Sequence, residues 1–287
     1  MKNENALTND KPFIVIKASG EKEMFSPEKL IRSLQKAGAD DERINLILSQ
    51  VQSQLYEGMS TGKIYQLAFS LLKRKSKPRA SKYKLKKAIY ELGPTGFSFE
   101  LYIAELFKKQ GYHVQIGQIV KGRCVKHEVD VSAEKADKHF MVECKFHQTG
   151  GIFCNVKIPL YVQARFKDIE LEWQQQEGHG NKFHQGWVVT NTRFSLDAIQ
   201  YGNCVGLYLL GWNFPHNDSL NKLIDSLRLY PITCLHSITA TEKQQLLKKK
   251  IILCKEICNN KQLLLNIGIT QNRIGIIMRE ATLLCDR

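Results

Sequence analysis

Apolar positions in the first third of the chain change their spacing from two residues to three or four. The runs FIVIK and KEMF alternate like strands and predict a hairpin around Ser19 and Gly20. Ser26 and Pro27 then begin a segment with helical spacing, as an N-cap residue and a first-turn proline do. Further helices are predicted from about Asp41, from about Thr61 and over 80–91. We therefore expect a small domain of one hairpin and four helices over 12–92.

A second pattern follows the turn GPTG. FSFELYIAELFKKQGY predicts an amphipathic helix that Gly111 ends, and strands then alternate with helices. The strands are predicted at 112–119, 127–133, 139–146, 185–190 and 205–210, and the helices at 157–173 and 194–202. This alternation is typical of an α/β sheet domain, here over 95–213.

The last pattern, over 216–287, has helical spacing only. Helices are predicted at 217–228, 241–249, 251–258, 260–266 and 270–285.

Charge adds a partner to this picture. The formal net charge is +14, which favours a polyanionic partner such as double-stranded DNA over a basic surface that binds nothing. No apolar run is long enough for a membrane span, and MKNENALTND has no signal-peptide core. The eight cysteines form no CxxC pair, which argues against a zinc site and predicts reduced thiols in a cytoplasmic protein.

Three charged residues interrupt strands that otherwise read as core. Asp130 lies in HEVDV, and Glu143 and Lys145 lie two apart in MVECKF, which places both on one face of their strand. If the strands pair, the carboxylates meet and repel each other unless a cation lies between them. Mg²⁺ prefers such oxygen ligands, and a lysine beside it would orient a water for phosphodiester hydrolysis. The alternative is a buried structural ion pair.

The α/β segment resembles the Mrr-like restriction endonucleases of the PD-(D/E)xK nuclease superfamily. The resemblance rests on GFSFELYIAELFKKQGYHV, HEVDV, MVECKF and GWVVTNTRFSLDAIQYGNCVGLYLLGWN in this order. It implies a mixed central sheet flanked by helices, with Mg²⁺ or Mn²⁺ held by Asp130, Glu143 and Glu100 and a water positioned by Lys145. RCVKHEVD stands where many relatives have a glycine-rich stretch, so the roles of His127 and Glu128 stay open. They either adjust the site, with Glu128 as an extra metal ligand, or are ordinary polar residues near the surface.

The first segment resembles the ATP-cone, a nucleotide-binding regulatory domain. Its hairpin, its FSPEKL helix start and MSTGKIY match in order, although KASG replaces the usual KRDG turn. The resemblance implies that ATP or dATP binds as an effector. The residues that it implies for the pocket are Lys17, Glu23, Ser26, Lys29, Thr61 and Tyr65, with phosphate contacts from Lys84 or Lys87. The alternative is an oligomerisation module that has lost its ligand.

Two further segments are candidates for DNA contact. Lys157, Gln163 and Arg165 would present donors to phosphates along one helix, unless that helix face is simply solvated. LLLNIGITQNRIGIIMREA resembles a helix-hairpin-helix, which implies phosphate contact at Gly268 and Arg273; a plain helical cap is the alternative.

Together these features predict an α/β protein with a metal-dependent DNA endonuclease domain. A nucleotide effector would control it by shifting a homo-oligomer equilibrium, and the nuclease resemblance implies a role in restriction or defence. Two other functions stay open: a non-catalytic, nucleotide-controlled DNA-binding regulator, and a structure-selective resolvase of the Holliday-junction type.

Overall fold

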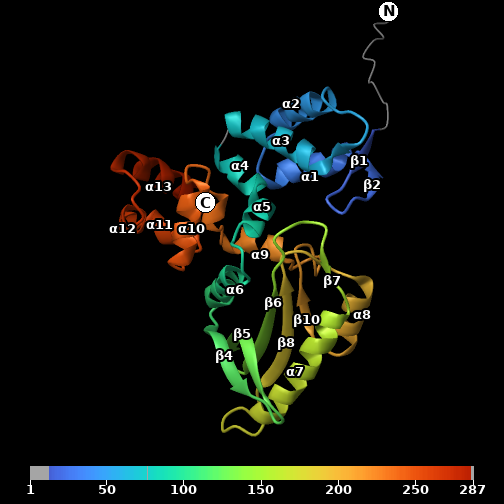
Figure 1. Cartoon of the computed structure of the whole chain (residues 1–287), viewed down its shortest axis with the longest axis vertical. Coiled ribbons are helices and arrows are strands. Elements are labelled where there is room, and N and C mark those ends of the chain that lie inside the picture. Colours follow the sequence, from blue (N-terminus) through green and yellow to red (C-terminus); the bar gives the residue numbers. More distant parts are fainter. Residues whose placement is uncertain (1–12, 76, 286–287) are drawn as a thin grey trace, which may run out of the picture. The chain divides into compact units, whose positions relative to one another are not determined.

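The computed structural model describes residues 13–75 and 77–285. The chain divides into two compact units, one that ends at Tyr83 and one that begins at Lys84. Their elements are labelled in Figure 1. Each unit is described by itself below.

The first unit is a small three-stranded sheet with helices. The strand order is β2-β1-β3; β1 pairs antiparallel with β2 through Val15 and Glu23, and parallel with β3 through Ile16 and Ser60. The elements are β1 (Ile14–Ile16), β2 (Lys22–Met24), α1 (Pro27–Lys36), α2 (Asp41–Gln52), β3 (Met59–Ser60), α3 (Thr61–Lys75) and α4 (Lys77–Tyr83). This unit confirms the predicted hairpin and its first three helices, and it adds the short strand β3.

Side-chain caps set the starts of these helices. The Ser26 hydroxyl accepts a hydrogen bond from the Lys29 amide at 3.2 Å, and Asp40 accepts one from the Arg43 amide at 3.0 Å. At the start of α3 the Ser60 hydroxyl accepts the Lys63 amide, so the capping residue precedes Thr61.

The helix predicted over 80–91 is divided into two helices. α4 ends at Tyr83, Lys84 lies in a turn, and α5 (Leu85–Tyr90) begins the second unit. Leu85, Ala88 and Ile89 are buried in the core of the second unit, and Thr233 donates a hydrogen bond of 2.7 Å to the Ala88 carbonyl. The division therefore falls before α5, inside the range expected to form one N-terminal domain.

A five-stranded mixed sheet forms the centre of the second unit. Its order is β10-β8-β6-β5-β4, with β4, β5 and β6 antiparallel and β6, β8 and β10 parallel. The strands are β4 (His113–Lys121), β5 (Lys126–Lys135), β6 (Lys138–Lys145), β8 (Phe183–Thr190) and β10 (Tyr208–Leu210). A separate parallel pair joins β7 (Phe153–Cys154) to β9 (Arg193–Phe194). The predicted mixed α/β fold is confirmed.

Helices cover both faces of this sheet. α7 (Lys157–Trp173) and α8 (Leu196–Cys204) lie against one face, and α6 (Phe97–Lys109) lies against the other (Figure 1). Val162 and Phe166 of α7 pack with Met141 and Val188 of the sheet. Phe99, Tyr102 and Phe107 of α6 pack in the other core with alternate strand residues such as Val142.

The C-terminal helices share the core of α6. The Tyr102 hydroxyl donates a hydrogen bond of 2.7 Å to the Leu229 carbonyl, and the buried Ile232, Leu253 and Ile277 belong to the same cluster. The elements are α9 (Leu220–Leu227), the short 3-10 helix η1 (Ile232–Cys234), α10 (Ala240–Lys248), α11 (Cys254–Cys258), α12 (Lys261–Leu265) and α13 (Gln271–Cys285). Within the described part of the chain, no helix has the length and apolar character that a membrane crossing needs.

Candidate nuclease active site

The candidate site lies where β5 and β6 separate. The two strands pair from Lys135 and Lys138 as far as Val131 and Val142, and their pairing ends there. The amide of Cys144, two residues beyond Val142 on β6, donates a 2.7 Å hydrogen bond to the Asp130 carboxylate. This bond fixes the Asp130 side chain between the diverging strands.

Glu143 lies on β6 between two cations. Its side chain is buried, with the Lys145 ammonium 2.6 Å from one carboxylate oxygen and the Arg165 guanidinium 2.5 Å from the other. Lys145 comes from the same strand face, as the ExK spacing predicts, whereas Arg165 comes from α7. The guanidinium also donates to the Glu128 carbonyl of β5, so Arg165 joins β5, β6 and α7 at the site.

Glu100 reaches the same site from the first turn of α6. Burial, together with the negative charges of Asp130, Glu128 and Glu143, raises the pKa of Glu100 to about 7. Burial likewise raises the pKa of Asp130 to about 6, with Glu143 as the next cause. Burial and mutual repulsion thus disfavour the charged carboxylates, and a divalent cation between them would relieve that repulsion.

A cavity of about 260 Å³ opens at these residues. It is lined by Lys126, His127, Glu128, Asp130, Glu143, Tyr161 and Arg165. The carboxylates of Asp130 and Glu143 face it and Glu100 lies within electrostatic range, so this chain offers an oxygen donor set of the kind that Mg²⁺ or Mn²⁺ takes. The cavity is open enough for a phosphodiester to approach these groups.

The structure distinguishes the two residues that precede Asp130. The His127 ring bonds to the Asp168 carboxylate of α7 at 2.7 Å, and Asp168 also accepts the amides of Cys124 and Val125. His127 therefore anchors the start of β5 to α7. Glu128 has an exposed side chain that lines the cavity, so its availability as an additional ligand stays a prediction.

The predicted DNA-contact residues of α7 have different environments. Lys157 is exposed at the start of α7, and Gln163 is half-buried with its side-chain oxygen enclosed and without a hydrogen-bond partner in the described part of the chain. Arg165 is engaged by Glu143 and by the Glu128 carbonyl. The Arg165 guanidinium is therefore directed at the candidate site, and contact of Arg165 with a DNA phosphate stays a prediction.

In the first unit, the residues implied for the nucleotide pocket lie on or next to β1, β2, α1 and α3. Glu23 of β2 pairs with Lys17 and with Lys29 of α1, each at 2.9 Å. Ser26 caps the helix that carries Lys29, and Thr61 follows Ser60, which pairs with the neighbour of Lys17. Tyr65 lies one turn further along α3 and stacks on Tyr83, with ring centres 5.0 Å apart.

The two lysines implied as phosphate contacts belong to the second unit. Lys87 is exposed on α5, whereas Lys84 is 9% exposed. The Lys84 ammonium lies 2.7 Å from Glu91 and donates to the Thr233 carbonyl at 3.1 Å. Lys84 is thus held inside the second unit, and a phosphate contact from Lys84 or Lys87 stays a prediction.

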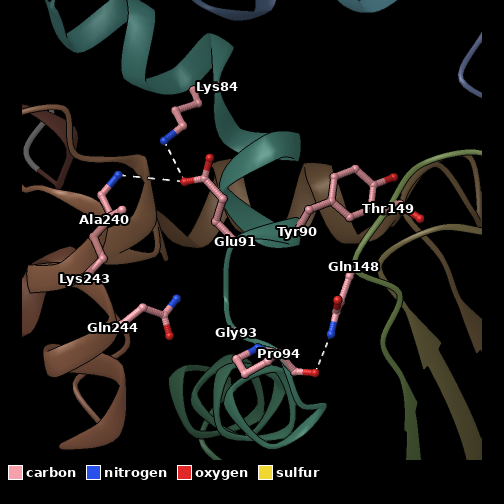
Figure 2. Close-up of a pocket in the computed structure, with 10 residues that line it drawn as sticks. All are labelled: Lys84, Tyr90, Glu91, Gly93, Pro94, Gln148, Thr149, Ala240, Lys243 and Gln244. Atoms are coloured by element: carbon pink, nitrogen blue, oxygen red, sulfur yellow. Dashed lines mark hydrogen bonds and ion pairs between the residues drawn. The ribbon is translucent and has the colours of Figure 1, made fainter.

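Lys84 and Glu91 line a second cavity of about 680 Å³ in the same unit. Figure 2 shows Lys84, directly before α5, and Lys243 of α10 converging on Glu91, with Gln244, Gln148 and Tyr90 around the opening. Lys243 donates to the same Thr233 carbonyl at 2.9 Å, and its ammonium is 3.8 Å from Glu91. Two buried ammonium groups therefore share one carboxylate and one carbonyl.

In the C-terminal segment, Gly268 and Arg273 have different environments. Gly268 lies exposed between α12 and α13 with φ of 80°, a left-handed conformation that favours glycine. Arg273 instead binds both oxygens of Glu242, at 2.5 and 2.9 Å, and the Ser237 carbonyl at 2.8 Å. These contacts hold α13 to α10, and phosphate contact at Gly268 and at Arg273 stays a prediction.

Comparison with known proteins adds three family models, matched in sequence order. They are the ATP cone domain over residues 13–89, the restriction endonuclease domain of the Mrr type over 93–210, and the AF1548-like C-terminal domain over 230–285. An uncharacterized protein of Archaeoglobus fulgidus is 34% identical over 180 residues, which is 62% of this chain and 97% of the relative. The crystal structure of AF1548, a protein of unknown function, matches with a TM-score of 0.55 and 31% identity over 66% of this chain and 98% of that one.

Proposed function

Because the chain belongs to the family of the Archaeoglobus fulgidus protein and carries an Mrr-type restriction endonuclease domain behind an ATP cone domain, we propose that it is a metal-dependent DNA endonuclease controlled by ATP or dATP. The observation that carries this proposal is the meeting of Asp130, Glu143 and Lys145 at the point where β5 and β6 separate. The net charge of +14 supports double-stranded DNA as the substrate.

Each charged group has a role that follows from its place. Asp130, Glu143 and Glu100 would hold Mg²⁺ or Mn²⁺, which supplies Lewis-acid polarisation of the scissile phosphate when bound. Lys145 lies 2.6 Å from Glu143 and is positively charged, so it orients the attacking water and stabilises the negative charge that develops on the phosphate. Arg165 keeps Glu143 directed at the cavity from α7.

Plasmid nicking in Mg²⁺ tests the catalytic assignment. We expect Asp130→Ala and Lys145→Ala to lower the nicking rate at least about a hundredfold, since each removes a group that acts in the transition state. The matched control is Lys109→Ala, at an exposed lysine at the end of α6 in the same unit. Equal rates in the wild type and both site variants would refute the nuclease assignment and leave the DNA-binding regulator, and comparing branched with linear DNA tests the resolvase alternative.

The proposed effect of the nucleotide is tested by measuring the molecular mass of the protein. We propose that ATP or dATP shifts an equilibrium between oligomers, because a ligand changes a population only through different affinity for its states. Light scattering of the full chain with and without each nucleotide should show a change in mass, together with a change in nicking rate. If neither mass nor rate responds to either nucleotide, the effector role is wrong while the nuclease assignment stands. A place in restriction or defence fits the matched domain family and is part of this proposal.

A further inference from the structure

Three histidines meet at the end of the sheet that lies away from the nuclease site. His139 and His184 are register partners at the starts of the parallel strands β6 and β8, so their rings project from the same sheet face. His179 comes from the loop 174–182 that joins α7 to β8. Each ring offers one nitrogen within 4.8 Å of the others.

The spacing of the rings matches a metal centre. The ring centres are 5.1 Å apart for His139 and His179, 5.5 Å for His139 and His184, and 5.8 Å for His179 and His184. A tetrahedral Zn²⁺ with Zn–N bonds of about 2.0–2.1 Å places the centres of its imidazoles about 5 Å apart. Shortening most of these distances by a few tenths of an ångström would bring the rings to the spacing expected for coordination.

The hydrogen bonds that the rings make do not involve their Nδ1 atoms. His139 uses Nε2 for the Ser132 hydroxyl at 3.0 Å, and His184 uses Nε2 for the His179 carbonyl at 3.1 Å. The Nδ1 atoms of all three rings are buried and have no hydrogen-bond partner among residues 13–75 and 77–285. His139 and His184 are 6% and 8% exposed, so water does not compensate them freely.

Burying three ring nitrogens without hydrogen-bond partners is energetically unfavourable. A metal ion that coordinates all three would remove this cost. We propose that His139, His179 and His184 bind a divalent transition metal, with Zn²⁺ as the expected ion, through their Nδ1 atoms. The Ser132 hydroxyl and the His179 carbonyl act as outer partners that fix ring tautomers, as such partners do in zinc sites.

The surroundings favour neutral, metal-binding imidazoles. Burial lowers the pKa of His139 to about 4 and also lowers the pKa of His179, so these rings are unprotonated at neutral pH. Trp173, the last residue of α7, stacks on His139 with centres 3.8 Å apart and covers the cluster with an apolar ring. Imidazole ligands select Zn²⁺ and its neighbours over Mg²⁺, which prefers oxygen.

This site is separate from the nuclease site and has a structural consequence. His139 and Glu143 are four residues apart on β6, or about 13 Å along a strand. The metal would tie the loop 174–182 to the starts of β6 and β8 and so hold the end of α7 against the sheet. It would stabilise the fold without taking part in cleavage.

Metal analysis of the purified full chain tests the site directly. After incubation with Zn²⁺ and desalting, we expect about one zinc per chain, which His179→Ala loses. His179 is the chosen position because it lies in a loop and is the least buried of the three. His216→Ala, at an exposed histidine outside the cluster, and Asp130→Asn, at the nuclease site, should both keep the zinc.

A second measurement does not depend on a variant. Removing zinc from the wild type by chelation should lower Tm, and an excess of Zn²⁺ should restore it by about 5 °C or more. Co²⁺ in its place should give the visible absorption of a tetrahedral centre. Less than about a tenth of an equivalent of Zn²⁺, Co²⁺ or Ni²⁺ in the wild type, with no shift in Tm, would overturn the proposal. So would equal zinc content in the wild type and a folded His179→Ala.

Discussion

Arg165 and Glu143 form the tightest charge contact of the candidate active site. The guanidinium Nη1 lies 2.5 Å from Glu143 Oε2, and both side chains are about nine-tenths buried. The other oxygen of the same carboxylate is occupied by Lys145. Two cations therefore stabilise the carboxylate of the residue that we propose as a metal ligand.

Replacing Arg165 should separate metal affinity from turnover. In Arg165→Met we expect the Mg²⁺ concentration for half-maximal nicking to fall, because a positive charge next to the metal ligands is gone. The maximal rate should fall about tenfold or more, since Glu143 loses the group that directs it and joins it to β5. Nicking rates over a Mg²⁺ series measure both quantities.

The control for this variant is Lys167→Met on the same helix. Lys167 is exposed and its ammonium pairs with Glu170 within α7, so neither quantity should change. An Arg165→Met protein with unchanged half-saturation and unchanged rate would show that the Glu143 contact is only structural.

In the first unit, Glu23 holds Lys17 and Lys29 together at 2.9 Å each. If these residues bind a nucleotide, Lys29→Ala should weaken ATP binding about tenfold, because the variant loses one charge-assisted hydrogen bond to phosphate. Lys36→Ala, at an exposed lysine in the last turn of the same helix, should bind as the wild type does. Calorimetry with the full chain measures both, and equal affinities would remove Lys29 from the nucleotide site.

Much of the fold follows from local patterns. The alternation in HEVDV and MVECKF places Glu143 and Lys145 on one face, and the structure keeps them there with an ion pair of 2.6 Å. The break at Lys84 has no such signal, because KYKLKKAIY contains good helix formers and neither glycine nor proline. The helix divides because Lys84 is buried against Glu91 and the Thr233 carbonyl, 149 residues away in sequence.

The residues that sequence reasoning assigned differently are those with distant partners. Arg165 and Arg273 each read as a cation on a helix, and only the packing of α7 and α13 shows the carboxylates that they bind. The histidine cluster was missed for the same reason. His179 and His184 are near in sequence, but His139 joins them only through the parallel pairing of β6 with β8.

The shared carboxylate of Glu91 predicts a stability effect. In Glu91→Gln two buried ammonium groups, Lys84 and Lys243, lose their counter-charge. We expect a loss on the order of 2 kcal/mol in the free energy of unfolding, below that of a fully buried pair because Glu91 is 33% exposed. Chemical denaturation of the full chain measures the change in this quantity.

The double variant Glu91→Gln with Lys243→Met should recover part of that loss, since one of the two uncompensated charges is then removed. Glu105→Gln removes pairs with Lys108 at 2.9 Å and with Lys255 at 3.8 Å. It serves as the control and should cost less than about 1 kcal/mol, because the two lysines are 49% and 42% exposed. A Glu91→Gln protein as stable as the control would contradict the view that Glu91 holds the two lysines in the fold.

Glu242 and Arg273 predict a pH dependence of stability in the C-terminal helices. Two hydrogen bonds from Arg273, with a smaller contribution from the Thr239 amide, lower the pKa of Glu242 from its ordinary 4.5 to about 2. Between these values the unfolded chain binds more protons than the folded one. The stability that this pair contributes is therefore complete above about pH 4.5 and is lost as pH falls towards 2.

Thermal denaturation of Glu242→Gln and Arg273→Met at pH 7 and pH 3 tests this contact. Both variants should melt below the wild type at pH 7, and the difference should shrink at pH 3, where the wild type has lost part of the same interaction. Glu177→Gln, at an exposed glutamate in the loop before β8, should follow the wild type at both values. A deficit of equal size at pH 7 and pH 3 would mean that the ion pair does not stabilise the fold. A loss of DNA affinity in Arg273→Met without any change in Tm would instead return Arg273 to the DNA-binding surface.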